Sequence, residues 1–388
     1  MSNTFAIPDP LPDTGAPLPS SGPIDFGPNV LVFDPTMPST ALQAQVDTLY
    51  QMQRADQFGT QRYAILLKPG TYSPLNLQVG FYTTVHGLGA IPDATTFQGS
   101  VYVTAEWMSG NATDNFWRGV ENLAIVPTNS NQTVMWATSQ ATWLRRIHLR
   151  GSIVLFDNTQ YTPPGVNWSS GGFIADSIID TQVTSGSQQQ YLTRNTQLTK
   201  WQGQNWNMVF VGDLNPPSGT WPADKYTVIP NTPIIREKPY LTVDAKNNYS
   251  VVVPALRKAS QGPSWTATGN TTPSNSIPLS KFYVAKPNVD TASSINLALQ
   301  RGLHLLLTPA FALDPWRLHS FATYRRSQRE YHRPRSRISH IATHWADAST
   351  HCRRRCRRHD RRITPRRGPG IVPESHAGRG THRQKCGQ

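Results

Sequence analysis

Two aspartates, Asp176 and Asp180, lie in the stretch of the chain that is richest in polar side chains. They stand four residues apart, with the apolar pair Ile178-Ile179 between them. Glycoside hydrolysis needs one carboxyl group that protonates the leaving oxygen and a second that activates water or attacks directly. The spacing predicts that both aspartates lie at the rim of one groove, which makes them candidate catalytic residues.

The same stretch continues with side chains that suit the binding of a sugar. Amide and guanidinium groups can hold hydroxyl groups, and a flat aromatic ring suits the C–H face of a pyranose. The candidate substrate contacts are Gln188, Gln190, Arg194, Asn195, Trp201 and Trp206. No metal ligands or cofactor-binding motif are expected here.

A structural interpretation of these residues competes with the catalytic one. Asp, Asn and Gln that stack at the corners of a repetitive β-fold commonly form hydrogen-bond ladders. Upstream, Arg145, Arg146, His148 and Arg150 alternate with apolar residues, which indicates a solvent-exposed face rather than a phosphate site.

The elements that must hold these side chains are mostly strands. The first 308 residues are rich in Val, Ile, Thr and Tyr, contain few charges, and show short alternating runs separated by Gly, Asn and Asp. One helix is expected over residues 39–55, with Ser39 or Thr40 as its N-cap, and a shorter one over residues 293–300. The apolar face of the first helix is expected to comprise Leu42, Val46, Leu49 and Tyr50.

The spacing of the strands indicates their arrangement. Apolar runs that begin at Val101, Leu123 and Ile147 start 22 and 24 residues apart, which is the length of one coil of a parallel β-helix. These three side chains are therefore expected to point inward as one ladder. An antiparallel sandwich or barrel would need closer hairpins with tight Asn-Gly or Asp-Gly turns, which are scarce here.

The charge of the chain is concentrated in its last eighty residues. The whole chain has 37 Lys+Arg and 23 Asp+Glu, and residues 309–388 contain 19 and 5 of these, which leaves 18 of each in residues 1–308. The net charge of +14 therefore lies in the tail alone. The neutral body gives no support to a nucleic-acid-binding function.

Three interpretations of the tail remain. Its Arg, His, Pro and Ser richness without apolar periodicity is typical of a GC-rich gene translated out of frame. A basic disordered segment that binds nucleic acid or an anionic membrane is the functional alternative. A zinc site at His351, Cys352, Cys356 and His359 is disfavoured, because adjacent arginines would repel the metal.

A rough internal repeat sets the expected domain boundaries. A strand, a short helix and a second strand that ends at proline occur near Leu31–Pro69 and again near Phe282–Pro309. We expect a disordered arm (1–26), a first parallel β-helix (27–215), an irregular connection (216–280), the start of a second, truncated β-helix repeat (281–309) and a disordered basic tail (310–388).

The segments GPNVLVFDP, FGTQRYAILLKPGTY, DNFWRGVENLAIVP and GGFIADSIIDTQVTSGSQQQYLTRN resemble a group of secreted right-handed parallel β-helix proteins of actinobacteria and fungi. The group belongs to the pectin-lyase-like superfamily and is similar in layout to the glucanases of glycoside hydrolase families 55 and 87. Family 55 enzymes carry two β-helices in tandem, and their cleft draws essential residues from the second. The resemblance implies an all-β fold and an extracellular location, although no signal peptide is recognisable.

The resemblance also implies a 1,3-linked glucan or a related polysaccharide as the partner, with activity incomplete in this chain. The alternative is a non-catalytic carbohydrate-binding or structural β-helix module. No membrane span is expected, since no stretch approaches eighteen apolar residues.

Overall fold

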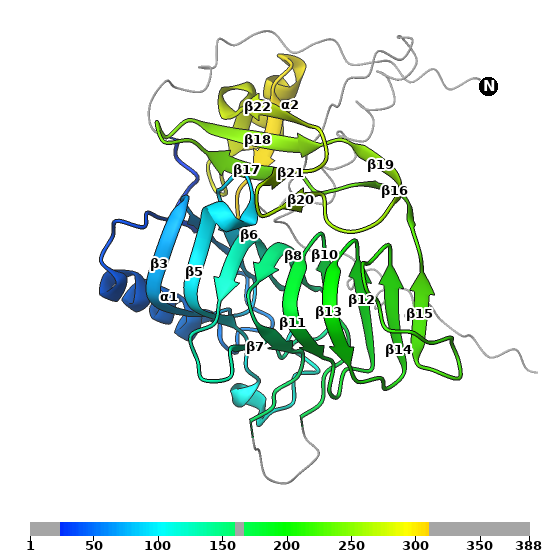
Figure 1. The fold of residues 1–388 in the computed structure, drawn as a ribbon. Helices are drawn as coiled ribbons and strands as arrows, with labels where there is room; N and C mark the ends of the chain where they lie inside the picture. The colour runs from blue at the N-terminus through cyan, green and yellow to red at the C-terminus, as the bar shows by residue number, and fades with distance from the viewer. Residues whose placement is uncertain (1–23, 160–166, 310–388) are drawn as a thin grey trace, which may run out of the picture. The chain divides into compact units, whose positions relative to one another are not determined.

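Parallel strands stacked coil upon coil form the body of the protein (Figure 1). The computed structural model describes residues 24–159 and 167–309. Its largest sheet has fifteen strands, and the strand pairs within it are parallel. The expected parallel β-helix is confirmed.

The coils present three successive layers of strands. The first layer pairs in chain order: β1 (Val30–Phe33), β2 (Tyr63–Leu67), β4 (Thr83–Gly87), β6 (Arg118–Val126), β8 (Thr142–Leu149), β10 (Phe173–Ala175), β12 (Gln190–Arg194), β14 (Asn207–Val211) and β15 (Tyr226–Ile229). The other two layers contain β3 (Gly70–Gln78), β5 (Thr95–Tyr102), β7 (Thr133–Met135), β9 (Ser152–Val154), β11 (Ile178–Thr184) and β13 (Gln197–Gln202). Short 3₁₀ turns are η1 (Pro92–Ala94), η2 (Glu106–Met108) and η3 (Leu279–Lys281).

Inward-facing ladders of apolar side chains explain why these strands stack. Val85, Val120, Leu144 and Ile174 pair in register along the first layer and are at most 2% exposed. Every coil therefore covers the apolar surface of the coil before it.

The ladder predicted from strand spacing is partly correct. Leu123 and Ile147 pair directly and are buried. Val101 is buried as well, but it pairs with Leu77 in another layer. The spacing between coils is predicted correctly, whereas the layer of Val101 is not, because each coil contains more than one apolar run and these runs look alike.

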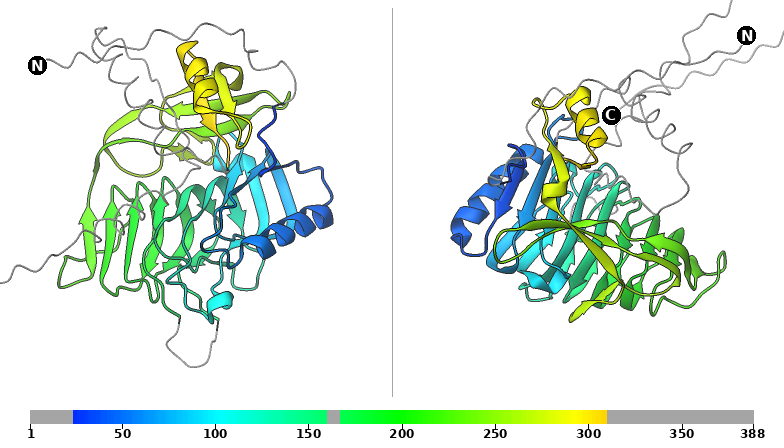
Figure 2. Two further views of the ribbon diagram at one scale, coloured as in Figure 1. Left: turned by 180° about the vertical axis from the view of Figure 1, so that it is seen from behind. Right: turned by 90° about the horizontal axis from the view of Figure 1, so that it is seen from above.

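Helix α1 (Ser39–Gln53) lies beside the first coils, at one end of the stack of strands (Figure 2). Its buried residues include the predicted Leu42, Val46, Leu49 and Tyr50. The predicted cap is wrong: the N-cap is Pro38, no side chain caps the helix, and Ser39 is already helical. The helix is instead fixed by tertiary hydrogen bonds, since Gln43 binds both the N–H and the carbonyl of Asn76.

The region 216–280 is more regular than expected. It begins with β15, which extends the parallel sheet beyond the predicted boundary at residue 215. Antiparallel pairs follow, with strands β16 (Thr232–Arg236), β17 (Tyr240–Val243), β18 (Tyr249–Pro254), β19 (Leu256–Ser260), β20 (Trp265–Thr266), β21 (Gly269–Asn270) and β22 (Ser274–Pro278). We call residues 230–278 the crossing segment, because it lies across the ends of β8, β10 and β12 (Figure 1).

The strand–helix–strand repeat has the same pairing in both copies. β1 pairs with β2 across α1, and β23 (Phe282–Ala285) pairs in parallel with β24 (His304–Leu307) across α2 (Ala292–Gln300). Helix α2 begins with a capping box between Thr291 and Ser294. The second copy thus reproduces the first coil of a parallel β-helix.

Several predictions fall outside the described residues. These are most of the N-terminal arm, the basic tail with its three interpretations, and the four residues considered for zinc. Within the described ranges, no helix is long and apolar enough to cross a membrane.

Candidate functional site

One corner of the β-helix carries an unusual column of residues, which lie within the long strands β6 and β8 and at or just after the ends of shorter first-layer strands. Strand register stacks Gly87, Asn122, Arg146, Asp176, Asn195 and Gly212 in that order. The four side-chain-bearing members all have positive φ angles, between 50 and 54°. Such a backbone is uncommon for residues other than glycine and persists where the surroundings hold it in place.

Gly87 shows how tightly this corner is packed. A Cβ atom at this position would lie 2.0 Å from the carbonyl oxygen of Asn122. Only glycine allows the two coils to approach this closely.

Asp176 is buried in the middle of this column, with 1% of its surface exposed. Ser264 donates to its carboxylate through the backbone N–H and, over 2.8 Å, through Oγ. Arg146 Nη1 lies 3.4 Å away, and Trp265 Nε1 donates to the Asp176 carbonyl over 2.7 Å. A carboxylate so enclosed cannot reach a substrate in this conformation, so the catalytic role predicted for Asp176 is incompatible with the structure.

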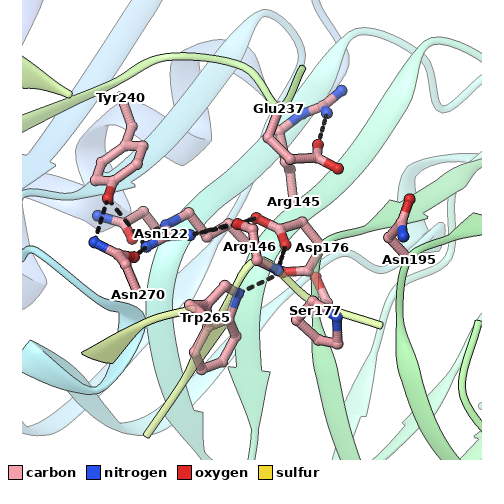
Figure 3. Close-up of polar contacts among 12 residues, drawn as sticks. Asn122, Arg145, Arg146, Asp176, Ser177, Asn195, Glu237, Tyr240, Trp265 and Asn270 are labelled. Atoms are coloured by element: carbon pink, nitrogen blue, oxygen red, sulfur yellow. Dashed lines mark hydrogen bonds and ion pairs between the residues drawn. The ribbon is translucent and has the colours of Figure 1, made fainter. Parts of the chain in front are cut away.

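Arg146 ties the corner to the crossing segment. Its Nε donates to Asn122 Oδ1 over 2.9 Å, and its Nη2 donates to Asn270 Oδ1 over 2.6 Å and to Tyr240 Oη over 3.1 Å (Figure 3). The side chain is buried beneath Tyr240, whose ring centroid lies 4.3 Å from its guanidinium carbon. The predicted exposed basic face is therefore wrong for Arg146.

Two predicted sugar-binding amides also belong to internal networks. Gln188 is fully buried and donates to the carbonyls of Thr138 and Leu155 over 2.9 and 2.5 Å. Asn195 is fully buried, accepts from Thr232 Oγ1 over 2.7 Å and donates to Ser260 Oγ over 3.2 Å. Neither can contact a ligand here, and both fit the ladder interpretation.

Asp180 lies apart from Asp176, on the outer side of β11, with its side chain 45% exposed. Its Oδ1 is 3.2 Å from His148 Nε2, and His148 Nδ1 is 2.8 Å from Asp93 Oδ1. Burial lowers the pKa of His148, but its hydrogen bond to Asp93 and the charges of both aspartates outweigh burial and raise it. His148, which was also predicted to be exposed, is buried between two carboxylates.

The sequence did not identify two ion pairs that fasten the crossing segment to the sheet. Lys238 Nζ lies 2.7 Å from Glu121 Oε1, and Trp143 Nε1 donates to the same oxygen over 2.6 Å. Burial alone would raise the pKa of Glu121, but the Lys238 ammonium overcomes it and lowers the pKa to about 2. Glu121 therefore stays ionised across the physiological range.

Glu237 forms the second ion pair, and its pKa is shifted in the opposite direction from that of Glu121. Its Oε2 lies 2.5 Å from Arg194 and 3.6 Å from Arg145. Burial, with the charge of Asp176, nevertheless raises the pKa of Glu237. Its other oxygen, Oε1, has no hydrogen-bond partner among the described residues. The only sequence signal was the charged triplet at residues 236–238 in a stretch that otherwise has few charges.

A small cavity lies beside the first of these ion pairs. It measures about 30 Å³ and is lined by His86, Glu121, Lys238 and apolar side chains such as Leu66 and Leu306. This volume is enough for a single water molecule but not for a sugar. Burial lowers the pKa of His86 to about 4, so the imidazole is neutral at physiological pH.

The outer face of the first layer is accessible beyond the crossing segment. Trp143, Phe173, Leu192 and Val209 form one outward row across β8, β10, β12 and β14, and Leu192 is 37% exposed. Gln190 is exposed at the start of β12 and pairs in register with Asn207. This face combines apolar rings with uncharged amides, which is a surface suited to a neutral sugar.

The two predicted tryptophans have opposite environments. Trp206 is 57% exposed at the corner that leads into β14. Trp201 is 8% exposed and packs edge-on against Phe210 inside the core, with ring centroids 5.0 Å apart. The predicted stacking role is therefore wrong for Trp201. Trp206 and Gln190 lie at the same edge of the sheet. Arg194 is held in an ion pair by Glu237.

No cluster of three or more potential metal-ligating side chains occurs in the described part of the chain. No model of a protein family matches the sequence. A curated exo-β-1,3-glucanase of Streptomyces sp. (strain SirexAA-E / ActE) is 49% identical over 286 residues, which is 74% of this chain and 45% of that protein.

Solved structures show the same similarity over the same share of this chain. The structure of sacteLam55A from Streptomyces sp. SirexAA-E superposes with a TM-score of 0.68 and 48% identity, over 74% of this chain and 50% of that one. A variant of sacteLam55A in complex with glucose matches equally well. This chain spans about half the length of these relatives, and over that half it is a parallel β-helix homologous to an exo-β-1,3-glucanase.

Proposed function

We propose that this protein is glycoside hydrolase-like and acts on a β-1,3-linked glucan. The observation that carries the proposal is the 49% identity to an exo-β-1,3-glucanase across the β-helix body. A relative in complex with glucose supports a glucose-containing ligand. Since such a polymer lies outside the cell, we also propose an extracellular location.

The open face of the first layer supports this class of substrate. Glucan is uncharged, and it presents alternating apolar C–H faces and hydroxyl groups. The row through Phe173 and Leu192 offers apolar contact, and Gln190 and Asn207 offer amide groups at one end of it. The ionised side chains near this face, Glu121, Arg145, Arg194 and Lys238, are engaged in ion pairs.

Hydrolysis of defined glucans by the full chain tests this proposal. We expect the chain to bind a soluble β-1,3-glucan in preference to a β-1,4-glucan of similar length and to release at most a little glucose from it, with products resolved by chromatography. Activity on the β-1,4-glucan alone would contradict the proposal. So would the absence of both binding and hydrolysis with every β-1,3-glucan offered.

A non-catalytic glucan-binding function is the second candidate. It is favoured by the burial of Asp176, Glu121 and Glu237, which leaves no pair of exposed carboxyl groups on the described part of the open face. Affinity electrophoresis separates the two functions: retardation of the protein in a gel containing β-1,3-glucan, without release of glucose, would establish binding alone.

A further inference from the structure

Three exposed tryptophans lie at one corner of the β-helix, where the chain enters strands of the first layer. Trp168 precedes β10, Trp206 precedes β14 and Trp221 precedes β15, and they are 52%, 57% and 40% exposed. Tryptophan is large and apolar, so three such side chains on one edge of a soluble domain are unusual.

Strand register places Trp168 and Trp206 on the same edge of the helix, two residues out of line with each other, because Ser170 aligns with Trp206 through Gln189. Ser169, next to Trp168, bridges to Gln188, and the Trp206 N–H donates to the carbonyl of Gln189 over 3.1 Å. Lys225 lies at the same edge on the next coil, since its carbonyl accepts from Met208 N–H, and its backbone N–H donates to Gln204 Oε1 over 2.9 Å. Its ammonium lies 5.5 Å from the ring centroid of Trp221.

This edge is opposite the one covered by the crossing segment. Asn195, just after the end of β12, binds Ser260 of the crossing segment, whereas the tryptophans precede the strand starts. The edge that carries the tryptophans is therefore separate from the buried corner column and its ion pairs.

Uncharged polar groups lie between the rings. Ser170 Oγ accepts from Gln140 Nε2 over 2.8 Å and donates to Gln189 Oε1 over 3.4 Å. Asn205 Nδ2 donates to the carbonyl of Gly186 over 2.6 Å, which holds the turn just before Trp206. Both glutamines and Asn205 are exposed.

This chemistry distinguishes between classes of ligand. Flat rings interspersed with amide and hydroxyl groups suit a neutral carbohydrate chain. A nucleic acid would require several cations for its phosphates, whereas the groups between these rings are uncharged amides and hydroxyls, with Lys225 beside Trp221. Trp168 and Trp206 are two coils apart, which is about 9.6 Å along the axis, and they are offset by two residues along the strands.

We propose that Trp168, Trp206 and Trp221 form a platform on which a β-1,3-glucan chain lies along the edge of the helix. The platform would hold polymeric substrate close to the open face. The choice of glucan rests on the proposed function; the platform itself rests on the exposure of the three rings and on their common edge.

Binding of the full-length protein to insoluble β-1,3-glucan, measured as a depletion isotherm, tests the platform. We expect the double variant Trp206→Ala/Trp221→Ala to bind about tenfold more weakly, and Trp168→Ala to show a smaller loss. Trp206→Phe should retain most of the affinity, because it keeps an aromatic face. Ile234→Ala is the control: this side chain is 62% exposed but lies in the crossing segment. Circular dichroism and the thermal midpoint should show that each variant is folded.

The outcomes separate the platform from the proposed substrate. Unchanged affinity of the double variant for β-1,3-glucan would overturn the platform and leave the proposed function standing. Binding of the unmodified protein to insoluble β-1,4-glucan alone, lost in the double variant, would support the platform and contradict the proposed linkage. Binding to neither polymer would overturn both.

Discussion

Arg146 and Asp176 occupy equivalent corner positions on neighbouring coils, and Arg146 Nη1 lies 3.4 Å from Asp176 Oδ2. Both residues have positive φ angles and are buried by the crossing segment. A buried charge is tolerated when it is paired and hydrogen-bonded. The burial of this ion pair therefore depends on the crossing segment, and the ion pair in turn helps to hold the crossing segment in place.

The substitution Asp176→Asn should destabilise the fold. It removes the negative charge that faces Arg146 and replaces one acceptor oxygen with a donor, so the free energy of unfolding should fall by about 2 kcal/mol or more. Chemical denaturation measures this, with Asp47→Asn on the exposed side of α1 as a control that should change it little. Unchanged stability together with a large loss of glucan hydrolysis would return Asp176 to catalysis.

Trp201→Ala and Trp206→Ala form a matched pair. Loss of the buried Trp201 ring opens a cavity beside Phe210 and should cost about 3–5 kcal/mol of unfolding free energy. Loss of the exposed Trp206 ring should change it by less than about 0.5 kcal/mol. Thermal or denaturant unfolding of the two variants checks this, and equal destabilisation would show that their environments are not as different as the structure indicates.

Asp213 should make the stability of the protein depend on pH. Burial raises the pKa of this carboxyl group to about 7, although Thr193 Oγ1 and the Thr196 N–H donate to it. The folded state therefore holds a proton that the unfolded state releases near pH 4. Its stabilising contribution is complete below about pH 4 and is lost as the pH rises through 7.

Comparison with Asp213→Asn isolates this effect. The unfolding free energy of the unmodified protein, relative to the variant, should fall by at least about 1 kcal/mol between pH 4 and pH 8. Unfolding curves at several pH values measure the difference. A constant difference across this range would show that Asp213 is ionised throughout.

His148 should contribute stability in its charged form. Because Asp93 and Asp180 raise its pKa above the usual 6.5 despite burial, its contribution is complete below pH 6.5 and is lost as the pH rises through the folded pKa. His148→Gln should therefore be most destabilising near pH 5.5 and progressively less so above neutrality. In a protein that already carries Asp180→Asn, the effect of His148→Gln on stability should depend less on pH. If the two substitutions have additive effects, the 3.2 Å contact between His148 and Asp180 contributes no energy.

The sequence by itself determined the architecture. Coil length, alternating apolar residues and the helix over residues 39–53 were all readable, because each reflects contacts along a strand or helix or with the adjacent coil. The strand–helix–strand repeat at residues 282–307 was readable for the same reason. Local periodicity reports which side of a strand faces a core.

Only the tertiary structure decided which polar residues are accessible. Asp176 resembles an exposed acid in the sequence, but it is covered by Ser264, which lies 88 residues later in the chain. Glu121 is held by Lys238 across 117 residues. No local pattern encodes where the crossing segment lies, since its position results from the packing of a whole domain. Trp201 and Trp206 differ for the same reason: alternation predicts two faces of a strand, and the fold determines which face another coil covers.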